Sequence, residues 1–283
     1  MTTWTYLLFC EKIKSKTRVM APQESKNISG VSYISFPFLN EYNIFCGFTS
    51  RDGGYSLGPY SSLNMAYHVG ESRELVKKNR ELVLREVLGC QADHIFSARQ
   101  VHGSSILYVG KNIKHRDGDI REDADVLMTD ERNMPLMVMG ADCTLILAAD
   151  TVSKAVCAVH AGWKGTLNRI VIPALQEFCS RFHSKTGDIN VFLGPCIRQC
   201  CYQIDKMLAA DFTDRFGEGG YLTAGEDSCY LDLAGINKGL LRGFGIREEN
   251  IFDTGICTCC SSNYYSYRRQ GVTGRQAAIA MLF

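Results

Sequence analysis

The chain has 283 residues, of which 46% are hydrophobic and 22% charged, and its formal net charge is +1. This composition is that of an ordinary globular protein with one large domain or two modest ones. No run of basic residues indicates nucleic-acid binding, and no apolar window approaches the ~18 residues that a membrane-spanning helix needs.

Residues 1–30 differ in texture from the rest of the chain. KIKSKTRVMAPQESKNISG is polar and without periodicity, and the short apolar stretch from Trp4 to Cys10 precedes its lysines, the reverse of a signal peptide. We therefore predict a variable N-terminal extension over residues 1–30, one domain over residues 31–283, and a cytoplasmic protein. The sequence does not decide whether translation begins at Met1 or Met20.

Hydrophobic periodicity predicts helices and strands along the rest of the chain. Helices are expected over 74–89, ended by Gly89, over 166–182, with a kink or lost hydrogen bond at Pro173, and over 209–216 and 231–245. Strands are expected over 104–110, 124–129, 135–141, 144–150, 154–161 and 189–194, and a buried final strand within 274–283. Because strands and helices do not alternate strictly, we expect an α+β fold of mixed sheets covered by helices, not a doubly wound one.

The segment ADCTLILAADTVSKAVCAVHAG reads as a β-hairpin with chemistry at its open end. If it turns between Thr151 and Val152, Cys143 lies directly opposite His160, with Cβ atoms ~4.5–5.5 Å apart. Two ligands of one zinc ion must come within about 3.6 Å of each other, which this pairing allows. His102, in QVHG, offers a third ligand.

A zinc ion held by two histidines and one cysteine keeps an open coordination position, as catalytic zinc sites do. A water bound there is acidified towards neutrality. Asp142 should point to the other face of a regular strand, where it is better placed to orient a neighbouring group or the substrate than to bind the metal. We predict it as a catalytic residue beside His102, Cys143 and His160. Spacing alone favours hydrogen-bonded core histidines and a buried Cys143 thiol over a metal site.

Several motifs resemble those of the YfiH-type family. QVHG, GADCTLILAAD, AVHAGWKG, GPCIRQCCYQI and SYRRQGVTGRQAA, with GFTSRDGGYSLGPYSSLN upstream, follow the family's order over residues 31–283. This family was long described as multicopper polyphenol oxidases or laccase-domain proteins. It is now described as purine nucleoside phosphorylases with adenosine deaminase activity.

The resemblance implies a four-layer α/β/β/α sandwich and an enzyme. The family's zinc ligands fall on His102, Cys143 and His160, which implies one zinc per chain. The implied reactions are phosphorolysis of adenosine, inosine and S-methyl-5'-thioadenosine to base and sugar 1-phosphate, and hydrolytic deamination of adenosine. The implied partners are a purine nucleoside and phosphate, and the sequence does not distinguish a monomer from a homodimer.

Five polar residues are candidates for substrate binding within this resemblance. Arg51 lies in a glycine-rich turn that could hold phosphate or ribose, and Asn64 is a weaker candidate for the same pocket. Lys164 follows His160 and can add positive charge near the metal. Arg268 and Arg269 sit in an aromatic tail suited to a purine and phosphate, and the sequence does not choose between them. The alternative for the segment of Arg51 is an ordinary turn without a ligand. The alternative for the aromatic tail is an exposed edge strand with solvated arginines.

The remaining cysteines include two clusters, GPCIRQCC (Cys196, Cys200, Cys201) and CTCC (Cys257, Cys259, Cys260). Their spacings match no usual zinc knuckle, which favours packing over a second zinc site. An odd total of 13 cysteines argues against a full disulfide framework.

Three other functions compete with the nucleoside enzyme. A copper-dependent polyphenol oxidase is disfavoured because the chain has six histidines and no His-x-His pair, although copper can enter a two-histidine, one-cysteine site. Cys143 could instead be the nucleophile of a hydrolase or amidase with His160 as its base. A binding protein with structural zinc would need a fourth ligand. The H-x-E and P-C-x-x-C elements of cytidine-type deaminases are absent from the sequence.

Overall fold

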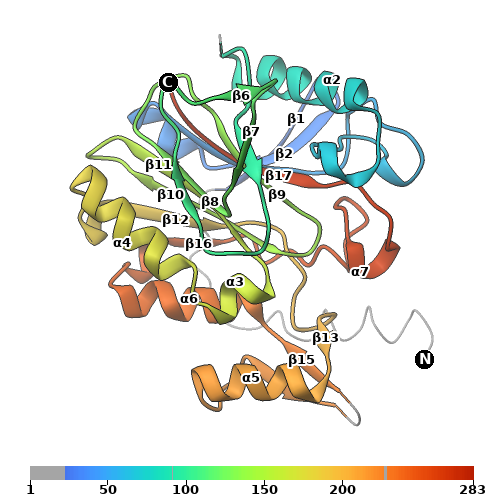
Figure 1. Cartoon of the computed structure of the whole chain (residues 1–283), viewed down its shortest axis with the longest axis vertical. Helices are drawn as coiled ribbons and strands as arrows, with labels where there is room; N and C mark the ends of the chain where they lie inside the picture. Colours follow the sequence, from blue (N-terminus) through green and yellow to red (C-terminus); the bar gives the residue numbers. More distant parts are fainter. Residues whose placement is uncertain (1–22, 91, 226–227) are drawn as a thin grey trace.

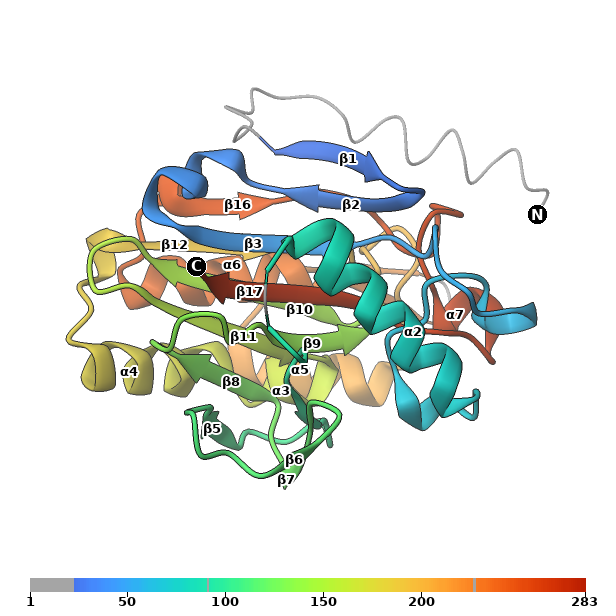
Figure 2. The same ribbon diagram turned by 90° about the horizontal axis from the view of Figure 1, so that it is seen from above.

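Two large sheets packed face to face form the centre of the molecule (Figures 1 and 2). The computed structural model describes residues 23–90, 92–225 and 228–283. Helix α2 (Arg73–Val83) covers the outer face of one sheet, and α4 (Val171–Phe182) and α6 (Leu233–Phe244) cover the outer face of the other. The expected α+β class and the α/β/β/α layer order are confirmed.

The first sheet has five strands in the order β1-β2-β3-β17-β9, all paired antiparallel. Its strands are β1 (Glu24–Ile28), β2 (Val31–Ser35), β3 (Ile44–Thr49), β9 (Leu136–Gly140) and β17 (Gln276–Leu282). The final strand β17 is buried along its whole length, as the sequence predicted. Strand pairing begins at Glu24, before the predicted domain boundary at residue 31, because β1 forms a hairpin with β2. The rest of the expected extension, residues 1–22, lies outside the described residues.

The second sheet has six strands in the order β16-β12-β10-β11-β8-β5 and mixes parallel with antiparallel pairs. Its strands are β5 (Ile106–Tyr108), β8 (Val126–Thr129), β10 (Thr144–Asp150), β11 (Ala155–Ala161), β12 (Ile189–Leu193) and β16 (Ile251–Asp253). β10 and β11, the two arms of the expected hairpin, lie in its centre and are fully buried.

Alternation along the central strands builds two cores. In β10, Leu145 and Leu147 face the other sheet, whereas Ile146 and Ala148 face α4. A strand alternates its side chains between two faces, and here both faces are buried. The same alternation in β17 sends Ala278 towards the second sheet. Packing of the two cores therefore determines which face of the sheet each side chain takes, including those at the ends of these strands.

The helices follow the predicted segments with one break. The α-helices of the described residues are α2, α3 (Trp163–Leu167), α4, α5 (Lys206–Phe216), α6 and α7 (Tyr267–Gln270). A π-helical turn, η4 (Leu84–Leu88), follows α2 directly. Gly89 ends the α2 segment with a positive φ of 56°. The expected helix over 166–182 is two helices, because Arg169 has a φ of 56° between them. Pro173 lies in the first turn of α4, where its missing N–H has no acceptor within the helix.

Shorter elements complete the chain. They are η1 (Pro37–Tyr42), η2 (Gly58–Tyr60), η3 (Tyr67–Val69), η5 (Thr186–Asp188) and η6 (Glu248–Asn250), a sheet of β4 (Ser97–Arg99), β7 (Asp119–Asp123) and β6 (His115–Arg116), and a sheet of β13 (Gln203–Ile204), β15 (Cys229–Leu231) and β14 (Leu222–Ala224). With α5, this last sheet projects from the sandwich (Figure 1). None of the helices in the described part of the chain is both long and apolar enough to cross a bilayer.

A buried ion pair ties the loop after β12 to β16 and α6. The side chain of Asp253 is 7% exposed and accepts hydrogen bonds from both terminal nitrogens of Arg198 and one from Lys238 Nζ at 2.9 Å. Burial disfavours ionisation of Asp253, but these two cations outweigh it and hold the pKa of the carboxyl well below its ordinary value. Asp253 therefore stabilises the fold when ionised.

We expect Asp253→Asn to destabilise the protein by about 3 kcal/mol at pH 7, because Arg198 then loses its buried counter-charge. A depressed native pKa means that the contribution is complete above the unfolded-state value of about 3.9 and is lost as the pH falls towards the native value. Urea unfolding at pH 7 and at pH 3 measures both effects. Glu248→Gln, which breaks the exposed pair with Arg242, is the matched control and should change stability by less than ~0.5 kcal/mol. Equal effects of the two variants would contradict the assignment.

Candidate active site

The predicted ligands line a cleft of about 410 Å³ where β9 and β11 end and the space between the two sheets opens. His160 is the penultimate residue of β11, Cys143 directly precedes β10, and His102 follows β4. The other lining residues come from several loops: His68, Gln100, Met139, Gly140, Ala141, Asp142, Trp163, Ile197, Tyr202, Tyr267, Arg268 and Arg275.

His102, Cys143 and His160 converge, as expected. Their ligand atoms all lie within 4.8 Å of one another, and Cys143 Sγ lies 3.7 Å from His102 Nε2. The two imidazole rings meet edge to face with centroids 4.7 Å apart. His160 is buried, Cys143 is half-buried and His102 is exposed, so the group opens to solvent on the His102 side.

The hairpin register that led to this cluster is corrected by the structure. His160 pairs with Leu145, not with Cys143, because the turn centres one residue further along than Thr151–Val152. The pairing shifts by two residues, and an even shift leaves every side chain on its predicted face. Cys143 is therefore a diagonal neighbour of His160. Asp142, with a φ of 95°, bends the chain out of the strand at that point.

A buried carboxylate that the sequence reading missed orients two of the three residues. Asp125 is fully buried; its Oδ1 lies 2.8 Å from His160 Nδ1, and its backbone oxygen accepts the His160 N–H. Its carboxylate also accepts the backbone N–H groups of Val101, His102 and Gly103. The signal in the sequence is an aspartate placed directly before the apolar strand β8, which neighbours β11.

The electrostatics of the cluster favour a charged sulfur. Burial disfavours the Cys143 thiolate, but the charge of His160 and hydrogen bonds from His102 and His160 outweigh it and lower the pKa of the thiol to about 6. Burial disfavours a charged His160, but the Cys143 thiolate and Asp125 raise its pKa to about 9. At neutral pH Cys143 is therefore a thiolate beside a protonated His160. A metal cation bound between the two side chains would neutralise the thiolate in place of that proton.

The donor set fits a zinc ion. Asp125 holds Nδ1 of His160, which leaves Nε2 for a metal, the arrangement typical of zinc-binding histidines. Gly162 leaves room beside the cluster, since a Cβ there would lie 2.7 Å from His102 Cδ2 and 3.1 Å from Cys143 Sγ. Thiolate and imidazole are ligands that suit zinc.

Asp142 lines the cleft but stands outside the three-residue cluster. Its Oδ1 accepts a 2.7 Å hydrogen bond from Thr258 Oγ1, and its Oδ2 accepts one of the same length from the backbone N–H of Arg268. Its backbone oxygen accepts the N–H of Ile197. Asp142 thus holds two loops of the cleft wall together.

The structure separates the two arginines of the aromatic tail. Arg268 lines the cleft, and its guanidinium lies 5.2 Å from the centre of the Tyr202 ring and donates to the Gln203 carbonyl. The guanidinium of Arg269 donates hydrogen bonds to backbone carbonyls, including those of Thr258 and Tyr264. Arg268 is therefore the one available to a ligand.

The other three substrate candidates are not among the described residues that line the cleft. Arg51 donates to the Ser61 carbonyl and lies over the Tyr265 ring. Asn64 is fully buried, and its Oδ1 accepts the backbone N–H of Arg275 at 3.0 Å, so it acts on the cleft through Arg275. Lys164 is exposed, 5.4 Å from the centre of the Trp163 ring. Their substrate roles stay predictions.

Arg275 and Gln100 line the cleft although the sequence reading passed over them. Gln100 exchanges two hydrogen bonds with the backbone of Met139, at 2.7 and 2.8 Å, which fixes β9 against the loop of His102. Arg275 precedes the buried strand β17 by one residue, in TGRQAA. With Arg268, it gives the cleft two cations beside the aromatic rings of Trp163 and Tyr202.

Comparison with known proteins identifies related chains. A family model described as multi-copper polyphenol oxidoreductase laccase matches residues 45–283. A purine nucleoside phosphorylase of Corynebacterium glutamicum is 31% identical over 236 residues, which cover 83% of this chain and 93% of that protein. The purine nucleoside phosphorylase YlmD of Bacillus subtilis is 31% identical over 246 residues, with 83% and 87% coverage.

Solved structures show the same fold. The structure titled hypothetical protein YfiH from Bacillus licheniformis superposes with a TM-score of 0.83 at 30% identity, covering 93% of this chain and 99% of that one. YlmD from Geobacillus stearothermophilus gives a TM-score of 0.81 at 28% identity, covering 93% and 98%.

We expect Asp125→Asn to weaken zinc binding about 10- to 100-fold, because the amide cannot hold His160 and three backbone N–H groups as the carboxylate does. Competition with a chromogenic chelator measures the affinity. Asp123→Asn, which changes an exposed aspartate two residues earlier, is the control and should bind zinc as the wild type does. Unchanged affinity in Asp125→Asn would contradict this orienting role.

Proposed function

The chain belongs to the multi-copper polyphenol oxidoreductase laccase family, and from this premise we propose that it is a zinc-dependent purine nucleoside phosphorylase with adenosine deaminase activity. The observation that carries the proposal is the cluster of His102, Cys143 and His160 in a cleft with two arginines and aromatic walls. Relatives named purine nucleoside phosphorylase support the reaction class. The proposed catalytic unit is the domain of residues 31–283.

The phosphorolysis substrates are adenosine, inosine or S-methyl-5'-thioadenosine, together with phosphate. The bond between the base nitrogen and the ribose carbon breaks, a phosphate oxygen bonds to that carbon, and the base leaves with a proton. The cations of Arg268 and Arg275 suit phosphate, because guanidinium groups bind its oxygens in pairs. The rings of Trp163, Tyr202 and Tyr267 suit a purine face.

The proposed zinc ligands are His102, Cys143 and His160. Zinc in such a site supplies a Lewis acid that acidifies water near neutral pH, which suits hydrolytic release of ammonia from adenosine. Asp125 keeps His160 in the tautomer that presents Nε2. Asp142 keeps the backbone of Arg268 against the cleft.

A copper oxidase fits these residues poorly. Among the described residues, the histidine-containing group close enough to share a metal is this one, with two histidines and one cysteine. A multicopper centre needs more histidine ligands than six histidines without a His-x-His pair supply. Copper in the three-residue site alone stays an alternative occupant.

A second candidate function is a metal-free hydrolase or amidase. In this function Cys143 is the nucleophile, His160 its base and Asp125 the carboxylate that orients the base. The lowered pKa of Cys143, the raised pKa of His160 and the hydrogen bond between His160 and Asp125 suit these roles. This reading uses the same three side chains, so the two functions are separated by the metal and by the substrate.

We expect the protein to release adenine from adenosine only when phosphate is present, together with ribose 1-phosphate, and to form inosine with or without phosphate. Chromatographic separation of products after incubation of the untagged enzyme measures both reactions. His102→Ala should lose both activities, whereas His183→Asn, an exposed histidine at the end of α4, should keep them. Inosine without adenine would reduce the function to deamination, and no turnover of any nucleoside would favour the amidase.

We expect His102→Ala combined with Cys143→Ala to lower the zinc content by about one ion per chain. Elemental analysis of protein purified without a histidine tag measures this loss. A strong chelator should abolish activity, and added zinc should restore it. If Cys143 is instead a nucleophile, the chelated enzyme stays active and iodoacetamide inactivates it through an adduct on Cys143. Cys90→Ser, a half-buried thiol away from the cleft, is the control for the cysteine change.

A further inference from the structure

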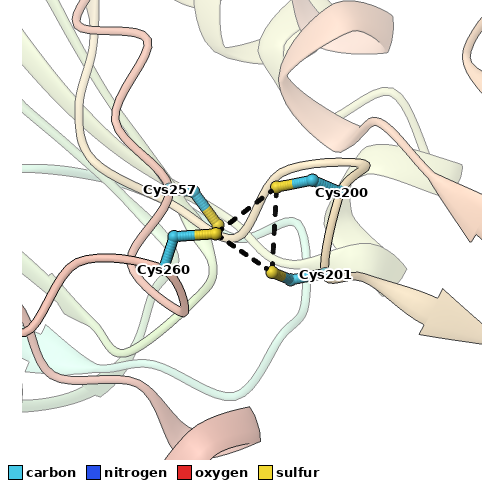
Figure 3. Close-up of side chains that lie close together, drawn as sticks. All are labelled: Cys200, Cys201, Cys257 and Cys260. Carbon is cyan, nitrogen blue, oxygen red and sulfur yellow. Dashed lines mark hydrogen bonds between the residues drawn. The ribbon is translucent and has the colours of Figure 1, made fainter. Parts of the chain in front are cut away.

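Four cysteine thiols from two distant segments converge beside the cleft (Figure 3). Two come from the loop after β12 and two from the loop after β16: Cys200, Cys201, Cys257 and Cys260. All four sulfur atoms lie within 4.8 Å of one another. Cys260 Sγ is 3.3 Å from Cys201 Sγ and 3.7 Å from Cys200 Sγ, and the latter two are 3.7 Å apart.

The backbone holds these two loops in register. Cys196 and Cys257 form a parallel β-bridge, in which Cys196 N donates to the Ile256 oxygen and Thr258 N donates to the Cys196 oxygen. The bridge fixes the start of each loop, and the cysteines follow within five residues. The sulfur atoms thus converge from two loops that are joined by backbone hydrogen bonds.

The spacing of the sulfur atoms fits a tetrahedral metal and not a disulfide. Zinc–sulfur bonds of about 2.3 Å place the ligands of a tetrahedron ~3.8 Å apart. A disulfide needs sulfur atoms about 2.05 Å apart, whereas the sulfur atoms of Cys200, Cys201 and Cys260 lie 3.3–3.7 Å from one another. Cys257 is buried and Cys260 is exposed, so the group has an inner end and an opening to solvent.

We propose that these four cysteines form a second metal site, distinct from the cleft cluster, that binds one zinc ion as a closed tetrathiolate. Four protein sulfurs leave no open position, which makes the site structural and not catalytic. Soft thiolates select zinc among the common divalent cations. Binding releases the thiol protons, and the resulting negative charge lies beside Arg268 and Arg269, which donate to the carbonyls of Cys201 and Cys259.

The zinc clamps the two loops that build one wall of the cleft. The first loop continues through Ile197 to Tyr202, and the second leads to Tyr267 and Arg268; all four of these residues line the cleft. Asp142 contacts the same two loops through Ile197 and Thr258. The second site shares no residue with His102, Cys143 and His160, so it does not depend on the proposed function.

The test begins with the metal content of the untagged full chain, where we expect about two zinc ions. Cys260→Ser should lose one of them and keep the zinc of the cleft. Cys259→Ser changes the neighbouring thiol, which is outside the group of four, and should keep both. In the double variant His102→Ala, Cys143→Ala, zinc-edge X-ray absorption should show the remaining ion with four sulfur ligands at about 2.3 Å.

Undiminished zinc in Cys260→Ser, or loss of an ion in Cys259→Ser, would overturn the proposal. Nitrogen or oxygen ligands in the double variant, or copper or iron in place of zinc, would do the same. A wild-type protein whose zinc is all lost with His102 and Cys143 would also overturn it, while leaving the proposed function intact. For the clamp, amide hydrogen exchange over residues 197–203 and 257–268 should speed up in Cys260→Ser and stay unchanged in α4. Unchanged exchange in the two loops would refute the clamp.

Discussion

The buried carboxylate of Asp125 is the interaction on which the cleft depends. It lies between β11, which supplies His160, and the loop that supplies His102, and it bonds to both. An unpaired carboxylate is costly to bury, so Asp125 must keep its hydrogen bonds. The position of Asp125 therefore sets the positions of its partners. Because β8 pairs with β11, the position of Asp125 is set by the central sheet. Asp125 therefore ties both His160 and the loop of His102 to the central sheet.

The sandwich also explains why the cleft lies where it does. The alternation that buries Val156 and Ala158 between the two sheets brings His160 to the same face, at the end of β11. The inter-sheet core ends there, and β9 of the other sheet closes the opposite side with Met139 and Gly140. A polar side chain at that position meets an opening instead of hydrocarbon. The length of β11 and the face of the strand on which His160 lies therefore place its imidazole in the cleft.

Strand period and motif spacing made much of the fold and the three-residue cluster predictable. Side-chain parity survived the register error, which is why Cys143 and His160 meet although they are not directly paired. Asp125 was not predictable from its neighbourhood, because its partners come from another strand and from a loop more than 20 residues away. Asn64 had the opposite fate: a polar residue beside a glycine-rich turn is fully buried and reaches the cleft only through Arg275. Local spacing does not encode either contact.

The cysteine clusters show the same limit more sharply. C-x3-C-C and C-x-C-C each look unsuited to a metal, since neither spacing alone presents four ligands to one point. Their ligands are complementary: each loop supplies two sulfurs, and the β-bridge between Cys196 and Cys257 brings the two pairs together. Asp142, which precedes Cys143 in the sequence, bonds to both loops from the cleft side. Its backbone oxygen accepts the N–H of Ile197, and its Oδ1 accepts the hydroxyl of Thr258. A metal that fixes the cysteine loops would therefore also fix Tyr202 and Arg268, which lie on those loops, and it would act on the cluster of His102, Cys143 and His160 through Asp142.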